Sequence, residues 1–301
     1  VLYNELVYLD EWINFHKRQG VDFFYINVVY QSEKDDKIFQ EFINKYQSDS
    51  GIILSHLDYT RFIHIYHFLT HYYKKHINDW LTIIDVDEFL YSPLENKKIT
   101  DIIEIYEKEQ KYAIGVNWKC FGSNNVDKNP DCKVLEKFTK CAIKYDGINC
   151  TVKTLVKISV LDIDEILSGK FTIHKYKLKS GYRYHTSSGI DYIEHNKSNY
   201  KFFNSGMNGT NIGDWVNRRG FKLSKKKNGI FIKKKFKLDT SQVYCEKNPY
   251  LTLNHYIVRS RDEYQFKITN NPHKRDRYNW NKFNFLNSIL NTTEDTTILD
   301  K

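Results

Sequence analysis

The sequence predicts an α/β fold built on a doubly wound sheet. Two observations over residues 1–120 favour this class. Short apolar runs rich in β-branched and aromatic residues are typical of buried strands, and amphipathic segments with helical spacing lie between them. The length is compatible with such a fold, because 301 residues suffice for one large domain or two small ones and can bury a core without any disulfide.

The first half of the chain alternates expected helices and strands. Residues 5–19 have the apolar spacing of a helix, and Gly20 is a suitable stop signal. Residues 21–30 (VDFFYINVVY) follow as a buried strand of a parallel sheet. The other elements expected here are a helix over 37–46, a strand over 51–57, a helix over 62–77, a buried strand over 80–84 (WLTII), a helix over 99–110 and a strand over 112–118.

The pattern changes after Phe121. Residues 122–135 are rich in loop-forming residues, and 261–301 look helical with a polar end. Because there is no repeat and no linker rich in Pro, Gly or Ser, we expect one domain over 1–260 with the segment 261–301 packed on it. Short strands between polar turns are expected at 154–160, 229–236 and 251–258.

Composition and charge narrow the class of protein. A hydrophobic fraction of 41% and a charged fraction of 28% are ordinary for a soluble globular chain. The net charge of +9, with a lysine cluster over 225–235 and phenylalanines at 231 and 236, prompts the hypothesis of nucleic-acid binding. We favour a solvated hairpin face for this cluster, because no nucleic-acid-binding motif occurs in the chain.

Cysteine usage and hydropathy bear on the compartment. The five cysteines form no C-x-x-C pair, so a zinc ribbon is excluded, and their odd count favours free thiols, with one or two disulfides as the alternative. No apolar run approaches the ~20 residues of a membrane span, and no signal peptide is present. The chain begins at Val1, which suggests an excised domain, cytoplasmic as given, whose full-length protein could be anchored or lumenal.

The most informative residues are the acids Asp85, Asp87 and Glu88, which follow the apolar run 80–84. In open α/β sheets, ligands bind beyond the carboxyl ends of the strands. Two neighbouring carboxylates repel each other, and Mg²⁺ or Mn²⁺ would relieve that repulsion while binding substrate phosphates. The simpler alternative is that Asp85 and Asp87 cap the next helix.

Four segments in the same order resemble motifs of family 92 and related family 2-like glycosyltransferases, and together they span about nine tenths of the chain. The opening from Asn4 and Glu5 through Glu11-Trp12 and His16 to Gly20 is similar to their "NE…L.EW..H...G" motif. The other three segments are WLTIIDVDEFL over 80–90, similar to "W…DvDEF", Trp118 to Ser123, similar to "W..FGS", and 253–267, similar to "NHY..kS.eeF..K".

The resemblance implies the GT-A fold, a Rossmann-like mixed sheet flanked by helices. Residues 1–120 would be its nucleotide-sugar-binding half and 121–260 a β-rich acceptor-side half. It also implies a metal-dependent, inverting transfer from a nucleotide diphosphate sugar, often a UDP-sugar such as UDP-galactose, to a glycan or glycoprotein, with Mn²⁺ or Mg²⁺ and without nucleic acid. The chain departs from the family's "DN.S.D" signature, of which Asn27 is retained, with Ser32 and either Asp35 or Asp36 as further candidates.

Residue roles follow from the motifs and the resemblance together. We assign Asn4, Glu5, Asn27, Asp85 and Lys267 to the donor. The metal ligands would be Asp85, Asp87 and the late histidine, His255, since neutral imidazole is a good Mn²⁺ ligand, with His174 and His185 as weaker alternatives. An inverting transfer also needs a general base, for which the candidates are Glu136, favoured because it follows the FGS loop, Asp191, Asp131 and Glu194.

Several of these residues also have simpler structural explanations. Trp118 and Phe121 would form either a sugar platform or ordinary core, and Arg259 either meets a diphosphate or belongs to a solvated face. The histidines at 64, 67 and 71 have helical spacing and are interpreted as one face of a helix. The altered donor signature also leaves room for a non-catalytic relative that binds a glycan or a partner.

Overall fold

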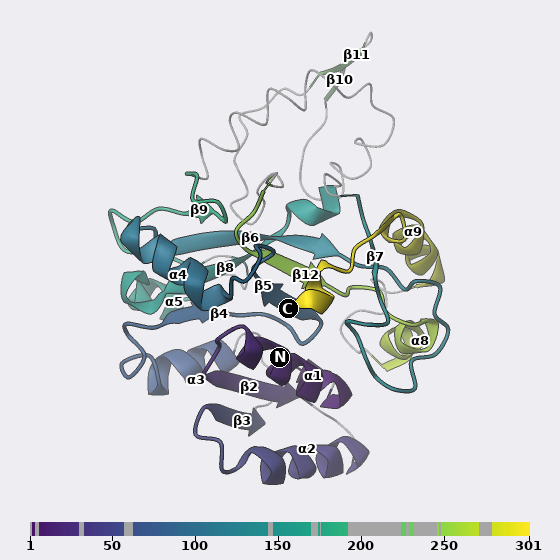
Figure 1. Cartoon of the computed structure of the whole chain (residues 1–301), viewed down its shortest axis with the longest axis horizontal. Helices are drawn as coiled ribbons and strands as arrows, with labels where there is room; N and C mark the ends of the chain where they lie inside the picture. Colours follow the sequence, from purple (N-terminus) through teal and green to yellow (C-terminus); the bar gives the residue numbers. More distant parts are fainter. Residues whose placement is uncertain are drawn as a thin grey trace.

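A computed structural model places two sheets at the centre of the molecule with helices around them (Figure 1). It describes residues 2–3, 6–29, 33–56, 63–143, 147–169, 174, 176–191, 224–226, 229–231, 246, 248–270 and 279–301. The expected α/β class with a mixed sheet flanked by helices is confirmed. Asn4, Glu5 and most of the lysine-rich region lie outside the described residues.

The first sheet is parallel and is built from the N-terminal quarter. Its order is β1 (Leu2–Tyr3), β2 (Phe24–Val29) and β3 (Ile52–His56). Around it lie a short 3₁₀ helix, η1 (Leu6–Tyr8), and the helices α1 (Leu9–Arg18), α2 (Glu33–Tyr46) and α3 (Ile63–His71). The prediction of a parallel strand over 21–30 is confirmed, although α3 ends six residues before Ile77. Beyond α3 the amides of Lys75 and His76 bond to carbonyls three residues back, which is turn geometry.

The second sheet is mixed and curled. Its order is β4 (Trp80–Thr82), β8 (Val152–Lys157), β6 (Ala113–Cys120), β12 (Thr252–His255) and β5 (Glu88–Tyr91), with β9 (His185–Thr186) also paired to β6. Strand β12 runs parallel to β6 and antiparallel to β5, and β8 runs antiparallel to β6 and β4. The prediction of a buried strand over 80–84 is wrong in part, because β4 is short, lies at one end of this order and is only half-buried.

The remaining elements cover these sheets or close their ends. Helix α4 and α5 lie at one side of the second sheet and α8 and α9 at the other (Figure 1). Strands β10 and β11 pair as an antiparallel hairpin, as expected for the lysine-rich region. The bounds are α4 (Ile99–Lys108), β7 (Lys140–Cys141), η2 (Gly147–Cys150), η3 (Ile158–Val160), α5 (Ile163–Leu167), β10 (Ser224–Lys226), β11 (Gly229–Phe231), α8 (Arg261–Asn270), α9 (Trp280–Leu290), β13 (Thr293–Glu294) and η4 (Thr297–Asp300).

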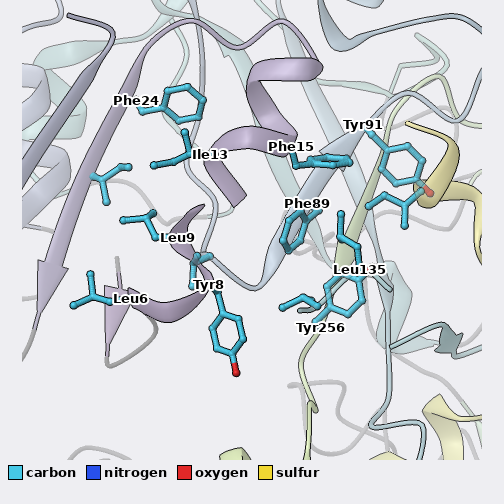
Figure 2. Packing of buried hydrophobic residues seen from close by; sticks show 14 of the residues in the cluster. Leu6, Tyr8, Leu9, Ile13, Phe15, Phe24, Phe89, Tyr91, Leu135 and Tyr256 are labelled. Carbon is cyan, nitrogen blue, oxygen red and sulfur yellow. The ribbon is translucent and has the colours of Figure 1, made fainter. Parts of the chain in front are cut away.

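Helix α1 fastens the first sheet to strand β5. The indole Nε1 of Trp12 donates to the Glu88 carbonyl at 2.8 Å, and the Leu90 amide donates to His16 Nε2 at 3.1 Å. Between these bonds, Phe15 packs edge-on against Phe89 with ring centroids 5.4 Å apart, and Figure 2 shows the two rings in the same buried cluster. Residues of the opening motif therefore hold the strand that begins at Glu88.

The same helix also organises the loop after β6. The Glu11 carboxylate accepts bonds from the amides of Val134 and Leu135 at 2.8 and 3.2 Å, which caps the turn in which Glu136 lies. Gly20, with φ of +89°, ends the helix as expected, and a Cβ there would lie 2.6 Å from the Thr100 side chain. The motif that carries the resemblance is thus largely a set of structural contacts.

A network of asparagine side chains ties the loop Gly122 to Asn125 to helix α9. Ser123 Oγ donates to Asn287 Oδ1 at 2.7 Å, and the backbone amide of Asn124 donates to Asn291 Oδ1 at 3.1 Å. A Cβ on Gly122 would lie 2.3 Å from that same Asn291 oxygen and 3.0 Å from Leu290 Cβ. The FGS loop therefore requires glycine because the helix packs directly against its backbone.

We expect Gly122→Ala to lower the free energy of unfolding by about 1–3 kcal/mol, the usual cost of overpacking. Chemical denaturation measures it. The matched variant Gly122→Ala/Asn291→Ala removes the clashing oxygen, so it should lose less stability than the sum of the two single changes. Strict additivity would contradict the proposed contact.

Two sequence expectations concern the whole chain. Within the described residues, Cys120, Cys132 and Cys141 are free thiols, in agreement with the expectation for these three. None of the helices among those residues has the length and apolar character needed to cross a bilayer.

Candidate active site

The acidic motif lies on the segment that joins the two ends of the second sheet. Residues 83–87 connect β4, at one end of the strand order, to β5, at the other, so the chain crosses the ends of the strands between them. The Glu88 amide donates to the Asp85 carbonyl at 2.9 Å and closes a turn around the two aspartates. Glu88 then opens β5 in register with His255 of β12.

Two of the three acids share one buried lysine. Lys153, on β8, has a side chain only 2% exposed, and its Nζ lies 3.2 Å from Asp85 Oδ2 and 3.0 Å from Glu88 Oε2. Glu88 is fully buried, and its Oε2 also accepts the Asp85 amide at 2.8 Å. The turn is thus fixed by one ammonium and one carboxylate acting together.

The surroundings shift the pKa values of Asp85 and Glu88 in opposite directions. Burial opposes ionisation of Asp85, whose side chain is still 42% exposed, but the combined positive charges around it, Lys153 foremost, hold the pKa of that carboxyl well below its usual range. For Glu88, burial and the neighbouring charges of Asp85 and Asp87 raise the pKa despite the attraction of Lys153. Burial alone would lower the pKa of Lys153, but the charges of these two carboxylates outweigh burial and raise the pKa.

Asp87 faces a different set of side chains. Its Oδ1 lies 3.8 Å from His255 Nε2, and its Oδ2 lies 3.7 Å from Lys267 Nζ on α8. Burial is the main cause that lowers the pKa of His255 to about 3, so its imidazole is neutral and keeps a lone pair. The turn of residues 85–88 therefore presents Asp85 and Glu88 to Lys153, and Asp87 to His255 and Lys267. The charge of Asp85 also acts on His255, whose pKa it raises against the larger effect of burial.

Asp87 and His255 fit a divalent cation as a pair. Both side chains are nearly buried, and the separation of their facing atoms is too long for a hydrogen bond but short enough for a shared ion. Over the residues that the structure describes, no cluster of three or more His, Cys, Asp or Glu side chains could hold a metal. Further ligands would have to come from substrate phosphates and water, as is common for Mg²⁺ sites.

The Trp118 ring stands beside these groups, whereas Phe121 meets His255 only through its backbone amide, which donates to the His255 carbonyl at 2.9 Å. The Trp118 ring lies 4.3 Å from the His255 ring and 5.5 Å from the His174 ring, centroid to centroid, and Trp118 is only partly buried. Phe121 is fully buried and packs on Tyr256, so the core reading holds for it. Trp118 remains a candidate for a platform beside the site.

The other predicted site residues lie in varied settings. Asn27, near the end of β2, is buried and accepts a bond from Ser55 Oγ at 3.2 Å. Glu136 is an exposed residue that pairs with Lys133 at 2.9 Å. Asp191 is mostly buried, with Arg183 Nη1 3.9 Å away, and stands just before the undescribed stretch 192–223. The roles of Glu136 and Asp191 as bases stay predictions.

Two buried basic residues could not be placed correctly from the sequence. Lys153 lies among apolar residues in the run VKTLVK, and the only signal was a lysine inside a strand-like stretch. Of the two alternatives for Arg259, the solvated face is wrong. Its side chain is buried over the Tyr8 ring, at 4.2 Å, and its Nε lies 3.2 Å from Glu263.

Comparisons with known proteins agree in the kind of protein they find. A family model for glycosyltransferase family 92 matches residues 2–202. A family 92 protein of Oryza sativa subsp. japonica is 25% identical over 258 residues, covering 82% of this chain and 41% of that protein. A family 92 protein of Ricinus communis is 27% identical over 201 residues, covering 61% of this chain and 31% of its own length.

The chain thus spans less than half the length of these two curated relatives. Among solved structures, the crystal structure of S. aureus TarS in complex with UDP has a TM-score of 0.32 and 14% sequence identity. That alignment covers 55% of this chain and 47% of the TarS chain.

Proposed function

Since the chain belongs to glycosyltransferase family 92, we propose that it transfers a sugar from a nucleotide diphosphate sugar to a hydroxyl group of a glycan or glycoprotein. The observation that carries the proposal is the arrangement around Asp87, whose two carboxylate oxygens face His255 and Lys267 at the ends of the strands. A carboxylate, a neutral imidazole and an ammonium together suit a cation and a diphosphate.

Each side chain has a role in this proposal. Asp87 and His255 would hold Mn²⁺ or Mg²⁺, which supplies positive charge to a departing diphosphate when bound. Lys267 would bind a phosphate oxygen, because its ammonium lies beside Asp87. Asp85 and Asn27 are proposed to contact the nucleoside, and so are Asn4 and Glu5, which the structure does not describe.

The finer features of the transfer rest on the family resemblance. We take UDP-galactose as the first candidate among UDP-sugars, and inversion as the stereochemical outcome. A base must then accept the proton of the attacking hydroxyl. Asp191 and Glu136 are the candidates, and the partial burial of Asp191 suits that role better than the exposure of Glu136. We propose that residues 1–260 form one catalytic unit, to which the segment 261–301 adds Lys267.

A donor screen tests the proposal. The purified chain is incubated with a panel of nucleotide sugars and Mn²⁺, and the released nucleoside diphosphate is measured alongside thermal shift. We expect Mn²⁺-dependent stabilisation by UDP and release of UDP from at least one donor. If calorimetric titration of UDP with Mn²⁺ detects no binding, a non-catalytic relative would be favoured instead. Salt-sensitive binding of nucleic acid together with no binding of UDP would favour the nucleic-acid hypothesis.

The histidine gives a sharper test of the cation site. We expect His255→Ala to weaken Mn²⁺ binding by roughly 10- to 100-fold, the range seen when a metal site is disturbed. Mn²⁺ titration followed by electron paramagnetic resonance measures it. His76→Ala is the matched control, because His76 belongs to another His–Asp pair, with Asp79 at 2.7 Å. Equal Mn²⁺ affinity in the two variants would make His255 a core residue.

A further inference from the structure

The ammonium of Lys153 occupies the position between Asp85 and Glu88 that a cation shared by the acidic motif would need. It lies 3.2 Å from Asp85 Oδ2 and 3.0 Å from Glu88 Oε2, and the lysine side chain is 2% exposed. A buried charge persists in a folded protein only when partners compensate it. The Lys153 charge is therefore compensated by the fully buried Glu88 and by Asp85, whose side chain is 42% exposed.

The backbone of the turn strengthens this division. Glu88 Oε2, which contacts Lys153, also accepts the Asp85 amide at 2.8 Å, so the lysine and the turn share one carboxylate oxygen. Lys153 enters from β8, opposite Val116 of β6, whereas His255 and Lys267 come from β12 and α8. Lys153 thus holds the turn through Asp85 and Glu88, while Asp87 faces His255 and Lys267.

We propose that Lys153 is a positioning residue of the transfer site: it keeps Asp85 away from the cation, so that Asp87 and His255 alone among the described side chains hold it. This inference rests on the proposed function, because it concerns the same cation. It also assigns Asp85 a role distinct from that of a metal ligand. Lys153 therefore acts through the two acids that it orients and touches no reacting atom.

The sign of an affinity change tests this role. Lys153→Met removes the charge and keeps most of the length of the side chain. We expect Mn²⁺ to bind the variant more tightly by roughly tenfold, the order of the Coulombic effect that removal of one nearby positive charge has on a divalent ion in a water-like dielectric. Structural damage alone would weaken Mn²⁺ binding. A gain in Mn²⁺ affinity therefore distinguishes a positioning role of Lys153 from a purely structural one. The readout is Mn²⁺ titration at neutral pH, with UDP affinity and thermal midpoint measured on the same samples.

Lys157→Met is the matched control. Lys157 lies on the same strand and also pairs with an acid, Glu107 at 2.6 Å, but this pair is partly exposed and involves none of the three motif acids. We expect its Mn²⁺ affinity to equal that of the unmodified chain. An affinity in Lys153→Met that is equal to the control, or weaker, overturns the inference. Absence of Mn²⁺ and UDP binding by the unmodified chain overturns the proposed function as well, so the two failures are distinguishable.

A second pair of variants covers the case in which Lys153→Met fails to fold. Lys153→Met/Glu88→Gln removes both charges of the buried pair, and we expect it to melt at a higher temperature than Lys153→Met. Compared with Glu88→Gln alone, it differs only by the lysine charge that holds Asp85. We expect tighter Mn²⁺ binding in the double variant than in Glu88→Gln, again by roughly tenfold. Equal affinities in these two variants would overturn the inference.

Discussion

Replacing Asp87 by asparagine is expected to reduce kcat/KM for sugar transfer by at least about 100-fold while the fold survives. The amide has nearly the same shape as the carboxylate, but it lacks the charge that faces His255 Nε2 and Lys267 Nζ. The cation would lose its anionic ligand, and the charge of a departing diphosphate would be less well compensated. Steady-state kinetics with the donor found in the screen measures the loss, and Mn²⁺ titration measures the loss of affinity.

The control for Asp87→Asn is the same substitution at Asp162. That residue caps helix α5, where its side chain accepts the Glu165 amide at 3.2 Å, and asparagine caps helices about as well as aspartate. Both variants should melt close to the unmodified chain. A variant at position 87 with undiminished kcat/KM would remove the residue from the mechanism, and an unfolded one would assign it to stability.

Acidification from about pH 6.5 to about pH 4 is expected to remove roughly 3 kcal/mol of stability through His16. Burial lowers the pKa of His16 from its ordinary 6.5 to about 4, because the folded state offers no water to the imidazolium. Between these values the unfolded chain binds the proton and the folded chain does not. Stability is therefore complete above the unfolded pKa and falls as the pH drops toward the folded one. Urea denaturation across this range, with chelator present, measures the slope.

The His16→Gln variant isolates this contribution. Glutamine can still accept the Leu90 amide but does not titrate, so the variant should lose part of the pH dependence while being less stable at neutral pH. His71→Gln is the matched control. The ring Nδ1 of His16 donates to the Trp12 carbonyl at 2.8 Å, and that of His71 likewise donates to a carbonyl four residues earlier, at 2.9 Å, but on an exposed face. The same slope in all three proteins would disprove neutral burial of His16 as the source.

Local patterns predicted the elements of the site, and the sequence could not predict how they meet. The apolar run before Asp85 and the strand around His255 were both visible because each is a feature of one segment. Their register, Glu88 opposite His255, joins residues far apart in the chain and depends on a strand order that periodicity does not encode. The family resemblance, rather than the spacing, brought the two together in advance.

Lys153 and Trp12 show why the remaining contacts were out of reach. A lysine inside VKTLVK is compatible with either face of a strand, and only the crossing of residues 83–87 over the strand ends supplies its partners. Likewise, the helical spacing of residues 5–19 predicted the buried face of α1 but not the bond from the Trp12 indole to a carbonyl 76 residues away. Such side-chain contacts depend on tertiary packing.

The bonds from α1 to β5 also bear on the solubility of the protein. An outermost strand normally offers unpaired amides and carbonyls that can recruit a strand from another molecule, which is a route to aggregation. On the last strand of the second sheet, the Glu88 carbonyl and the Leu90 amide are instead occupied by Trp12 and His16. Loss of these two side chains would uncover a template for intermolecular β-pairing next to the acidic turn.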